Sequence, residues 1–361
     1  MLPSDFFSKK CYQSMDAIMC VMMNFIQWKL RHQTTTKKCL EAYLEECSSL
    51  DRTTYFATPP MEEFVQQSLS GHNVLSWKSP RQGPFSENNR ARALFFPADQ
   101  HNSTSRDKFL SDNKSFNRQQ RTPNCKLQLR PNDQNSKVPT LIILHALMSA
   151  SDRGYRRIAA QMNQRGWNVL FPHLPFHYSR RPNGYSNGAL AVTADLVRNG
   201  ETLRQAVKEI RQLMDWSRVQ GSERIGILGT SYGGWIASLV LSLEKVDFSL
   251  LLQPITEIDY ATFKSPLSRI MARLLTAQGI TSKHLNRHAH LTSPTHGIPQ
   301  CAPERLIVIG GSYDTIALPK HLQHCCHYWK SSLYDEVEQG HFGHRAMRRA
   351  MEHIDFLISR E

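Results

Sequence analysis

The second half of the chain alternates between short apolar runs and longer segments whose apolar residues recur every three or four positions. Short apolar runs are typical of buried strands, and the longer period is typical of amphipathic helices. The runs predict strands over residues 139–145, 166–172, 224–229, 248–253, 305–309 and 333–337. The longer pattern predicts helices over residues 152–165, 190–218, 318–329 and 345–358. This alternation predicts an α/β fold with a doubly wound, mostly parallel sheet.

Residues 1–70 are predicted to form an N-terminal helical extension of an α/β domain that covers residues 71–361. Helical spacing between positions 12 and 30 predicts one apolar helix face, made of Met15, Ile18, Met19, Met22, Met23, Ile26 and Leu30. We expect this face to pack on the α/β domain, and an interfacial membrane helix is the alternative. A second helix is predicted over residues 38–47, and two strands over 72–77 and 91–96.

Two segments interrupt the regular alternation. Residues 99–138 are polar with few apolar side chains, so a mobile insertion is expected, because such a stretch buries too little to offset its ordering entropy. Residues 255–302 predict a cap-like insertion with one amphipathic helix over residues 267–275. The histidines of this second segment lack a spacing that is typical of a metal site: His284, His288, His290 and His296.

A nucleophile-elbow motif stands between the predicted strand 224–229 and an apolar helix. Its residues are Gly229-Thr230-Ser231-Tyr232-Gly233, which match the pattern G-x-S-x-G. A serine on so tight a turn has a strained backbone, and glycines beside it avoid a collision with the turn. The motif therefore predicts that Ser231 is a nucleophile at the carboxyl ends of the parallel strands.

The proton-transfer partners of Ser231 are expected downstream in the chain. A serine hydroxyl needs a base to accept its proton, and the base needs a carboxylate to orient it. After a nucleophile elbow, the acid precedes the histidine in the sequence. Asp314 follows the predicted strand 305–309 and His341 follows the last strand, so these residues are the predicted acid and base. Asp259 and Glu257 are alternative acids. A second histidine, His344, is expected at a helix cap or on the surface.

An oxyanion hole is predicted from two backbone N–H groups. One belongs to Tyr232 at the start of the helix after the elbow, and the other to the loop after strand 139–145. That loop reads His145-Ala146-Leu147-Met148. Leu147 is the preferred donor, and Ala146 is the second choice.

Composition and charge narrow the possible partners. The chain has 361 residues, 40% of them hydrophobic, and can bury a sizeable core. A net charge of +13 with a pI near 9.5 favours anionic partners. No zinc-finger spacing and no basic region followed by heptads occurs, so a specific nucleic-acid partner is not expected. The charge indicates either a solvated basic surface or peripheral contact with an anionic membrane surface.

The cysteines and the apolar runs indicate a cellular location. The eight cysteines follow no disulfide-framework or zinc spacing, which indicates a reducing compartment. The apolar run over residues 17–26 lacks a small-residue cleavage site, so it is not a typical signal peptide. No run of about 18 apolar residues occurs, so a transmembrane helix is not expected. The prediction is a cytoplasmic protein whose membrane contact, if any, is peripheral.

With strand, elbow, acid and base in this order, the chain from about residue 70 onward resembles the α/β-hydrolase superfamily of esterases, lipases and dienelactone-hydrolase-like enzymes. A narrower resemblance, to bacterial hydrolases related to alpha/beta-hydrolase domain-containing protein 18, lies in Trp77-Lys78-Ser79-Pro80, Glu87-Asn88-Asn89 and Leu174-Pro175-Phe176-His177-Tyr178-Ser179-Arg180-Arg181-Pro182. The resemblance places the family's serine, acid and histidine on Ser231, Asp314 and His341. Ala146 stands where the superfamily commonly has glycine, which implies a tighter oxyanion loop.

Two hypotheses of different class follow. The first is a serine hydrolase that cleaves an ester-type acyl bond of a small-molecule or lipid-like substrate, with no cofactor and no metal; thioester and peptide bonds are alternatives. Arg180 and Arg181 follow a core strand, so they either bind a substrate carboxylate or phosphate at the rim of the site or are solvated. The second hypothesis is a non-catalytic protein of the same fold that binds a partner or an anionic lipid surface.

Overall fold

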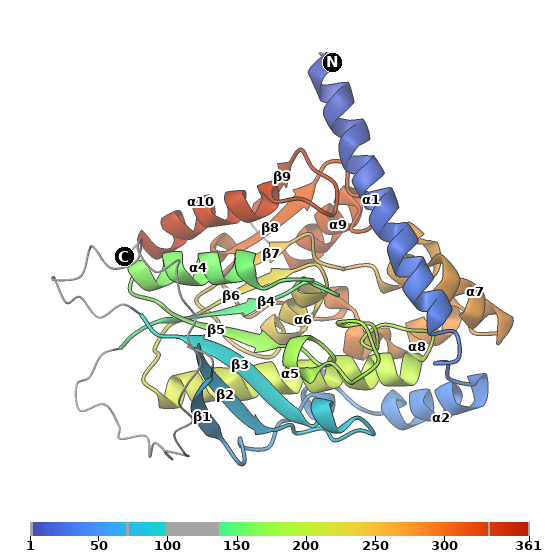
Figure 1. The fold of residues 1–361 in the computed structure, drawn as a ribbon, viewed down its shortest axis with the longest axis horizontal. Helices are drawn as coiled ribbons and strands as arrows, with labels where there is room; N and C mark the ends of the chain where they lie inside the picture. Colours follow the sequence, from blue (N-terminus) through green and yellow to red (C-terminus); the bar gives the residue numbers. More distant parts are fainter. Residues whose placement is uncertain (1–2, 70–71, 99–136, 331–332, 360–361) are drawn as a thin grey trace, which may run out of the picture.

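A nine-stranded mixed sheet forms the centre of the protein (Figure 1). The computed structural model describes residues 3–69, 72–98, 137–330 and 333–359. Its strands are β1 (Val65–Leu69), β2 (His72–Lys78), β3 (Arg90–Phe96), β4 (Thr140–Leu144), β5 (Asn168–His173), β6 (Ile225–Thr230), β7 (Phe248–Leu252), β8 (Leu306–Gly311) and β9 (Leu333–Val337).

The strands lie in the order β1-β2-β3-β5-β4-β6-β7-β8-β9. The pairs β1–β2, β2–β3 and β3–β5 are antiparallel, and the pairs from β5 to β9 are parallel. The prediction of an α/β fold with a mostly parallel sheet is therefore confirmed. Because the carboxyl ends of β6, β7, β8 and β9 meet at one edge, the loops after these strands can supply a common site.

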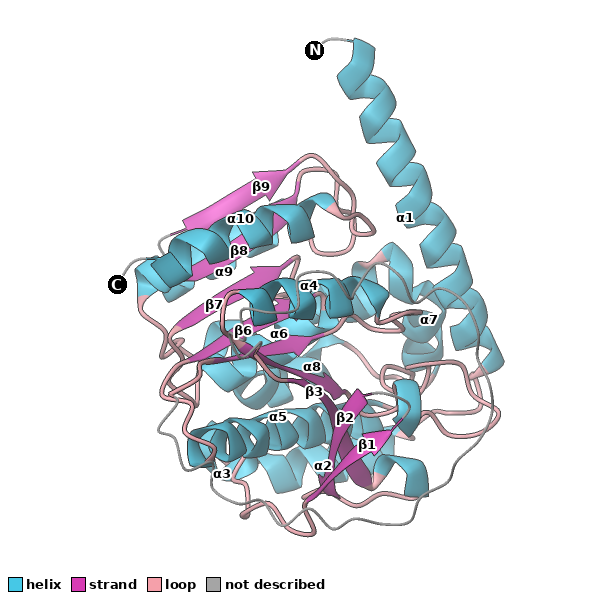
Figure 2. Ribbon diagram, turned by 60° about the vertical axis from the view of Figure 1, so that its left-hand side comes forward, coloured by secondary structure: helices cyan, strands magenta, loops and turns pink. Residues whose placement is uncertain are grey.

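Helices cover both faces of the sheet (Figures 1 and 2). On one face, α4 (Arg153–Gln164) and α10 (Arg345–Ser359) bury Ile158 and Ile354 against apolar strand residues. On the other face, α5 (Leu196–Val219), α6 (Tyr232–Leu241) and α9 (Pro319–Trp329) bury Ile210, Ile236 and Leu322. The central strands β4 and β7 are buried along their whole length, which explains why they read as continuous apolar runs.

The N-terminal residues form α1 (Pro3–Lys29), α2 (Lys37–Ser48) and α3 (Arg52–Tyr55), and β1 also lies within the predicted extension. Helix α1 packs on the protein with only part of the face that we predicted. Of the predicted residues, Met15, Ile18 and Met22 are exposed, Met19 and Ile26 are half-buried, and Met23 and Leu30, the latter just after the helix, are buried. The buried face also includes Asp16, Cys20 and Gln27. The prediction was wrong for the exposed positions because polar side chains anchor the inner face: the amides of Asn24 and Gln27 donate to the carbonyls of Pro266 and Val192, at 2.9 and 2.7 Å.

The segment over residues 255–302 contains two α-helices where the sequence predicted one. Helix α7 (Arg269–Ala277) matches the predicted amphipathic helix, and α8 (Ser282–Thr292) follows it. The sequence analysis missed α8 because its sequence is polar and rich in histidine, so its apolar periodicity is weak. Its N-terminus has a capping box of Thr281 and His284, with His284 in place of the usual glutamate. Helix α8 packs on α2, so the N-terminal residues and this segment form one layer. The predicted insertion over residues 99–138 lies outside the described residues except at its last two positions.

Candidate active site

Ser231 lies at the turn between β6 and α6 with a backbone conformation that serine rarely adopts. Its φ and ψ angles are 52° and −112°, and its N–H donates to the carbonyl of Leu252 at 2.8 Å. A Cβ atom at Gly233 would lie 2.3 Å from the carbonyl oxygen of Leu144, and one at Gly229 would lie 2.8 Å from the carbonyl oxygen of Gly233. These contacts are too short for any side chain, so the turn requires both glycines of the motif.

The loops after β8 and β9 bring Asp314 and His341 to Ser231. The Ser231 hydroxyl oxygen lies 2.8 Å from Nε2 of His341, and Nδ1 of His341 lies 2.8 Å from Oδ2 of Asp314. Ser231 and Asp314 are buried, at 8% and 3% exposure, and the side chain of His341 is 6% exposed. The alternative acids are engaged elsewhere, Asp259 with Lys264 and Glu257 with His324, and His344 is exposed just before α10.

Gln253 holds the Asp314 carboxylate, and the sequence analysis did not identify it. The Gln253 amide donates to Oδ2 of Asp314 and, at 2.9 Å, to the carbonyl of Gly340, while the N–H groups of Ile316 and Ala317 donate to Oδ1. Gln253 follows β7 directly and has a φ of 47°, as Ser231 has after β6. A polar residue directly after a fully buried strand was the available signal, because such strand ends line the site of this fold.

Charge around the imidazole of His341 favours its protonated form. Burial of the ring lowers its pKa, but the adjacent Asp314 carboxylate, its hydrogen bond to Nδ1 and the charge of Asp16 outweigh burial, and the net result is a raised pKa. A base of this kind can take a proton from Ser231 and hold it as an ion pair with Asp314.

The loop over residues 145–148 offers one of its two predicted oxyanion donors. The N–H of Ala146 donates to the Tyr155 hydroxyl at 3.2 Å, and this contact favours Leu147, the preferred donor. The N–H of Leu147 has no acceptor among the described residues, and the N–H of Tyr232 lies in the first turn of α6, where helices leave N–H groups unpaired. Leu147, Tyr232 and Ser231 line the same cavity.

Two buried histidines hold this loop in place, and neither was predicted. His177 Nε2 accepts the N–H of Met148 at 3.1 Å, and its Nδ1 donates to the carbonyl of Pro175 at 2.8 Å. His145 Nε2 accepts the N–H of Leu174 at 3.2 Å, and the two rings lie 4.7 Å apart. Burial lowers the pKa of both imidazoles, that of His177 to about 4, so both act as neutral hydrogen-bonding groups.

Arg180 does not lie at the rim of the site. Its side chain is 1% exposed, forms an ion pair with Glu209 of α5, and donates to the carbonyls of His173 and Asn88 at 3.0 and 2.7 Å. Arg181 is exposed but does not line the cavity at Ser231. The proposed substrate contact of Arg180 was therefore wrong: its guanidinium is already paired, and no face of it is open to a ligand.

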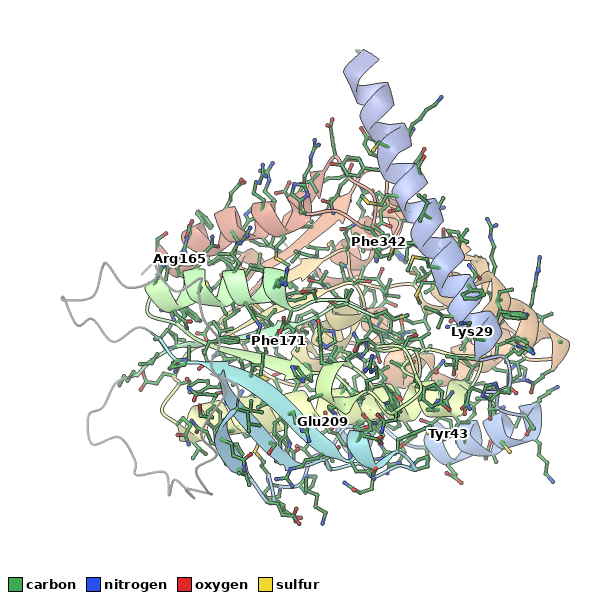
Figure 3. All side chains as sticks on the ribbon, viewed as in Figure 1. Lys29, Tyr43, Arg165, Phe171, Glu209 and Phe342 are labelled. Carbon is green, nitrogen blue, oxygen red and sulfur yellow. The ribbon has the colours of Figure 1, made fainter. Side chains whose placement is uncertain are left out.

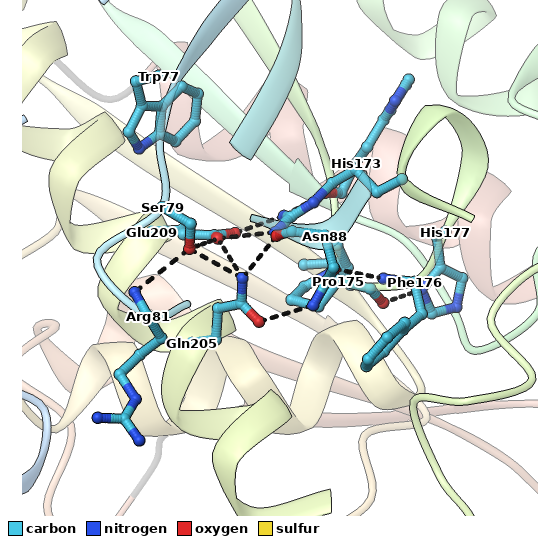
Figure 4. A network of polar contacts seen from close by, with 12 residues as sticks. Trp77, Ser79, Arg81, Asn88, His173, Pro175, Phe176, His177, Gln205 and Glu209 are labelled. Carbon is cyan, nitrogen blue, oxygen red and sulfur yellow. Dashed lines mark hydrogen bonds and ion pairs between the residues drawn. The ribbon is translucent and has the colours of Figure 1, made fainter. Parts of the chain in front are cut away.

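The Arg180–Glu209 pair joins the motifs that carry the family resemblance. Figure 4 shows Glu209 bonded to Ser79 and Gln205, with Asn88 beside them. Asn88 also accepts the N–H of Phe176 at 2.9 Å, directly before His177. The motifs thus form one buried polar network under the segment that positions the oxyanion loop.

An apolar cavity of about 130 Å³ opens beside Ser231. Its wall comes from α1 and α2, from α5 and α6, and from the cap segment with α7 and α8, with Met23, Leu44, Leu147, Leu203, Met271 and Leu285 among the lining residues. Among the described residues, no three His, Cys, Asp or Glu side chains are grouped as a metal site would require. Of the described helices, none is both long and apolar enough for a membrane crossing.

The sheet, the elbow and the arrangement around Ser231 define the α/β-hydrolase fold. The acetyl xylan esterase from Paenibacillus sp. R4 is similar in structure, with a TM-score of 0.56 and 11% identity over 90% of this chain and 96% of that chain. The acylaminoacyl peptidase from Pyrococcus horikoshii is also similar, with a TM-score of 0.48 and 14% identity over 83% of this chain and 42% of that chain.

Within this fold, residues 120–263 match the family described as "Alpha/beta hydrolase domain containing 18", which confirms the narrower resemblance predicted from the motifs. Two Mycobacterium tuberculosis proteins, the uncharacterized proteins Rv2627c and MT2702, are each 42% identical to this chain over 84 residues. The matching segment spans 23% of this chain and 20% of each relative.

Proposed function

We propose that this protein is a serine hydrolase that cleaves esters of hydrophobic acyl groups. The observation that carries the proposal is the 2.8 Å contact between the Ser231 hydroxyl and His341 Nε2 at the mouth of an apolar cavity. A hydroxyl hydrogen-bonded to an oriented imidazole is the arrangement that makes a serine nucleophilic. The apolar wall favours an alkyl or aryl acyl group, because that wall offers few polar partners.

The reaction proceeds in two halves. Ser231 Oγ attacks the ester carbonyl as His341 takes its proton, and the N–H groups of Tyr232 and Leu147 stabilise the oxyanion. The C–O bond to the alcohol breaks, the imidazolium returns its proton to the leaving alcohol, and an acyl-enzyme forms. Water then attacks the acyl carbonyl with His341 again as base, and the carboxylic acid leaves. Asp314 holds the ring and stabilises the imidazolium throughout.

A fluorophosphonate probe tests the function. It should label the wild type and leave Ser231→Ala unlabelled, while Ser242→Ala, at the other end of α6, should label like the wild type. Nitrophenyl esters of increasing acyl length should be hydrolysed at rates that depend on chain length, because the cavity has a limited volume of about 130 Å³. A folded wild type that takes no label would refute the enzyme and favour a non-catalytic protein of the same fold.

The outer face of α1 supports a second function, docking on an anionic lipid surface. Ile18, Val21 and Phe25 are 64%, 70% and 53% exposed and lie on one face of the helix. The side chains of Lys29 and Arg31 lie over the rings of Phe25 and Trp28. Between residues 9 and 31, Asp16 is the single acidic residue and it is buried, so the exposed face is apolar and basic. These are the properties of an interfacial helix that binds anionic lipid.

Liposome flotation tests this docking. The wild type should float with vesicles that contain phosphatidylserine and remain in solution with phosphatidylcholine vesicles. Val21→Ser combined with Phe25→Ser should remain in solution in both, and Val219→Ser, at an even more exposed apolar position on α5, should behave like the wild type. A dimer in solution that the same double substitution dissociates would assign this face to a second copy of the chain and refute lipid docking.

A further inference from the structure

Asp16 lies on the N-terminal helix, yet its carboxylate contacts the loop of the proposed base. It accepts the N–H of His341 at 2.9 Å and the N–H of Phe342 at 3.2 Å, and the Thr315 hydroxyl lies 3.4 Å away. Figure 3 shows Phe342 beside α1. The contact therefore joins residues 325 positions apart in the sequence.

We propose that Asp16 is a positioning residue for His341, so that helix α1 is part of the active site. The proposal rests on the serine hydrolase function proposed above. Asp16 does not touch the reacting atoms; it fixes the main chain of residues 341 and 342, and thereby the direction of the imidazole toward Ser231.

The burial of Asp16 supports a specific role. The residue is 1% exposed, and no lysine or arginine of the described ranges forms an ion pair with it. A buried carboxylate without a cation is costly unless several donors satisfy it. Here the donors are the two N–H groups of the His341 loop, which α1 alone could not supply. Helix α1 thus places a buried carboxylate where it can bind the main chain of the His341 loop.

The loop is shaped to receive this carboxylate. A Cβ atom at Gly340 would lie 2.6 Å from Oδ1 of Asp16, so only glycine lets the carboxylate pack against the main chain. The carbonyl of the same Gly340 accepts from Gln253, which also holds Asp314. His341 is therefore fixed from two sides, through Asp16 on its N–H and through Asp314 on its ring.

Asp16 also contributes to the charge that the imidazole experiences. Asp314 faces both His341 and Asp16, and Cys20 faces Asp16, while Arg269 and the Tyr260 hydroxyl face Cys20 from the cap segment. Burial raises the pKa of Asp16, and its charge is among the effects that raise the pKa of His341. Loss of this negative charge should let His341 lose its proton at a lower pH.

The test compares fluorophosphonate labelling rates of the full chain from about pH 5 to pH 9. Asp16→Asn should lower the labelling rate about tenfold or more. The asparagine amide has only one acceptor oxygen, so its NH2 group would face one of the two loop N–H groups that the carboxylate accepts. The acidic side of the pH profile of Asp16→Asn should also move to lower pH. Asn24→Ala removes another anchor of α1, to the segment with Pro266 and Ile270, and should change neither the rate by more than about threefold nor the pH profile.

Gly340→Ala provides a second route if Asp16→Asn fails to fold, because it displaces the carboxylate and leaves Asp16 unchanged. It should lower the labelling rate in the same way. If Asp16→Asn or Gly340→Ala labels like Asn24→Ala at every pH, the positioning role is refuted. If the folded wild type takes no label at all, the proposed function itself is refuted, which is a distinguishable result.

Discussion

Replacement of Arg180 separates a structural from a substrate-binding role of this residue. Arg180→Met removes the cation of a buried pair and leaves the Glu209 carboxylate with the Ser79 hydroxyl and the Gln205 amide as its donors. It also leaves the carbonyls of His173 and Asn88 without the guanidinium.

The expected loss can be worked from these contacts. Removal of one partner of a buried ion pair costs about 3–5 kcal/mol, because the other charge stays buried. Since Glu209 keeps two neutral donors, we expect about 3 kcal/mol, a large part of the stability of a typical domain. Glu209→Leu alone should cost a similar amount, and the double substitution Arg180→Met with Glu209→Leu should cost clearly less than the sum of the two.

Urea unfolding of the four proteins at neutral pH measures these values. Arg218→Met is the control, on α5 with Glu209, because the Arg218 side chain is 39% exposed beside Asp215 and Glu244 and should contribute less than about 1 kcal/mol. In ester hydrolysis, Arg180→Met should leave KM unchanged at temperatures where it stays folded. If Arg180→Met were as stable as the wild type and had a raised KM, the structural role would be refuted and a substrate contact of Arg180 would be supported.

Three further predictions concern the site. Because the pKa of His341 is raised, the ring takes up its proton above the usual value of 6.5; kcat/KM should therefore fall as the pH drops through an inflection above 6.5, and Asp314→Asn should move that inflection down. Gly233→Ala should unfold or severely destabilise the protein in thermal melts, whereas Gly83→Ala, where no atom lies within 4 Å of the added Cβ, should melt like the wild type. Leu44→Trp should shorten the longest nitrophenyl ester that is hydrolysed and leave the shortest one unaffected, because Leu44 lines the cavity from α2, whereas Ser231 precedes α6.

The parts of the site that sequence reasoning reached are those that a local rule specifies. The elbow is set by steric limits over five residues, and the positions of Asp314 and His341 follow from strand order, so both could be placed without coordinates. Leu147 could be preferred to Ala146 as the oxyanion donor, but Ala146 could not be dismissed from the sequence. The difference between the two N–H groups depends on the Tyr155 hydroxyl, which comes from α4.

The parts that sequence reasoning missed depend on contacts between distant segments. Arg180 looks like a surface residue after a strand, and only the position of Glu209 on α5 makes it a buried one. The inner face of α1 was assigned from apolar periodicity, whereas Asp16 and Gln27 occupy it because acceptors and donors of the α/β domain lie opposite. Periodicity records which residues are apolar and does not record which polar residues have partners.

Helix α1 connects three parts of the proposed enzyme through one rigid element. Asp16 holds the loop of His341, and Met23 and Gln27 line the cavity about two and three turns further along. The opposite face carries the exposed stripe around Val21 and Phe25. A shift of α1 relative to the α/β domain would therefore alter the cavity wall and the direction of the His341 imidazole together. If lipid binds the outer face, it acts on the same helix that sets the geometry of the base, so vesicles should change the labelling rate of the wild type more than that of Asp16→Asn.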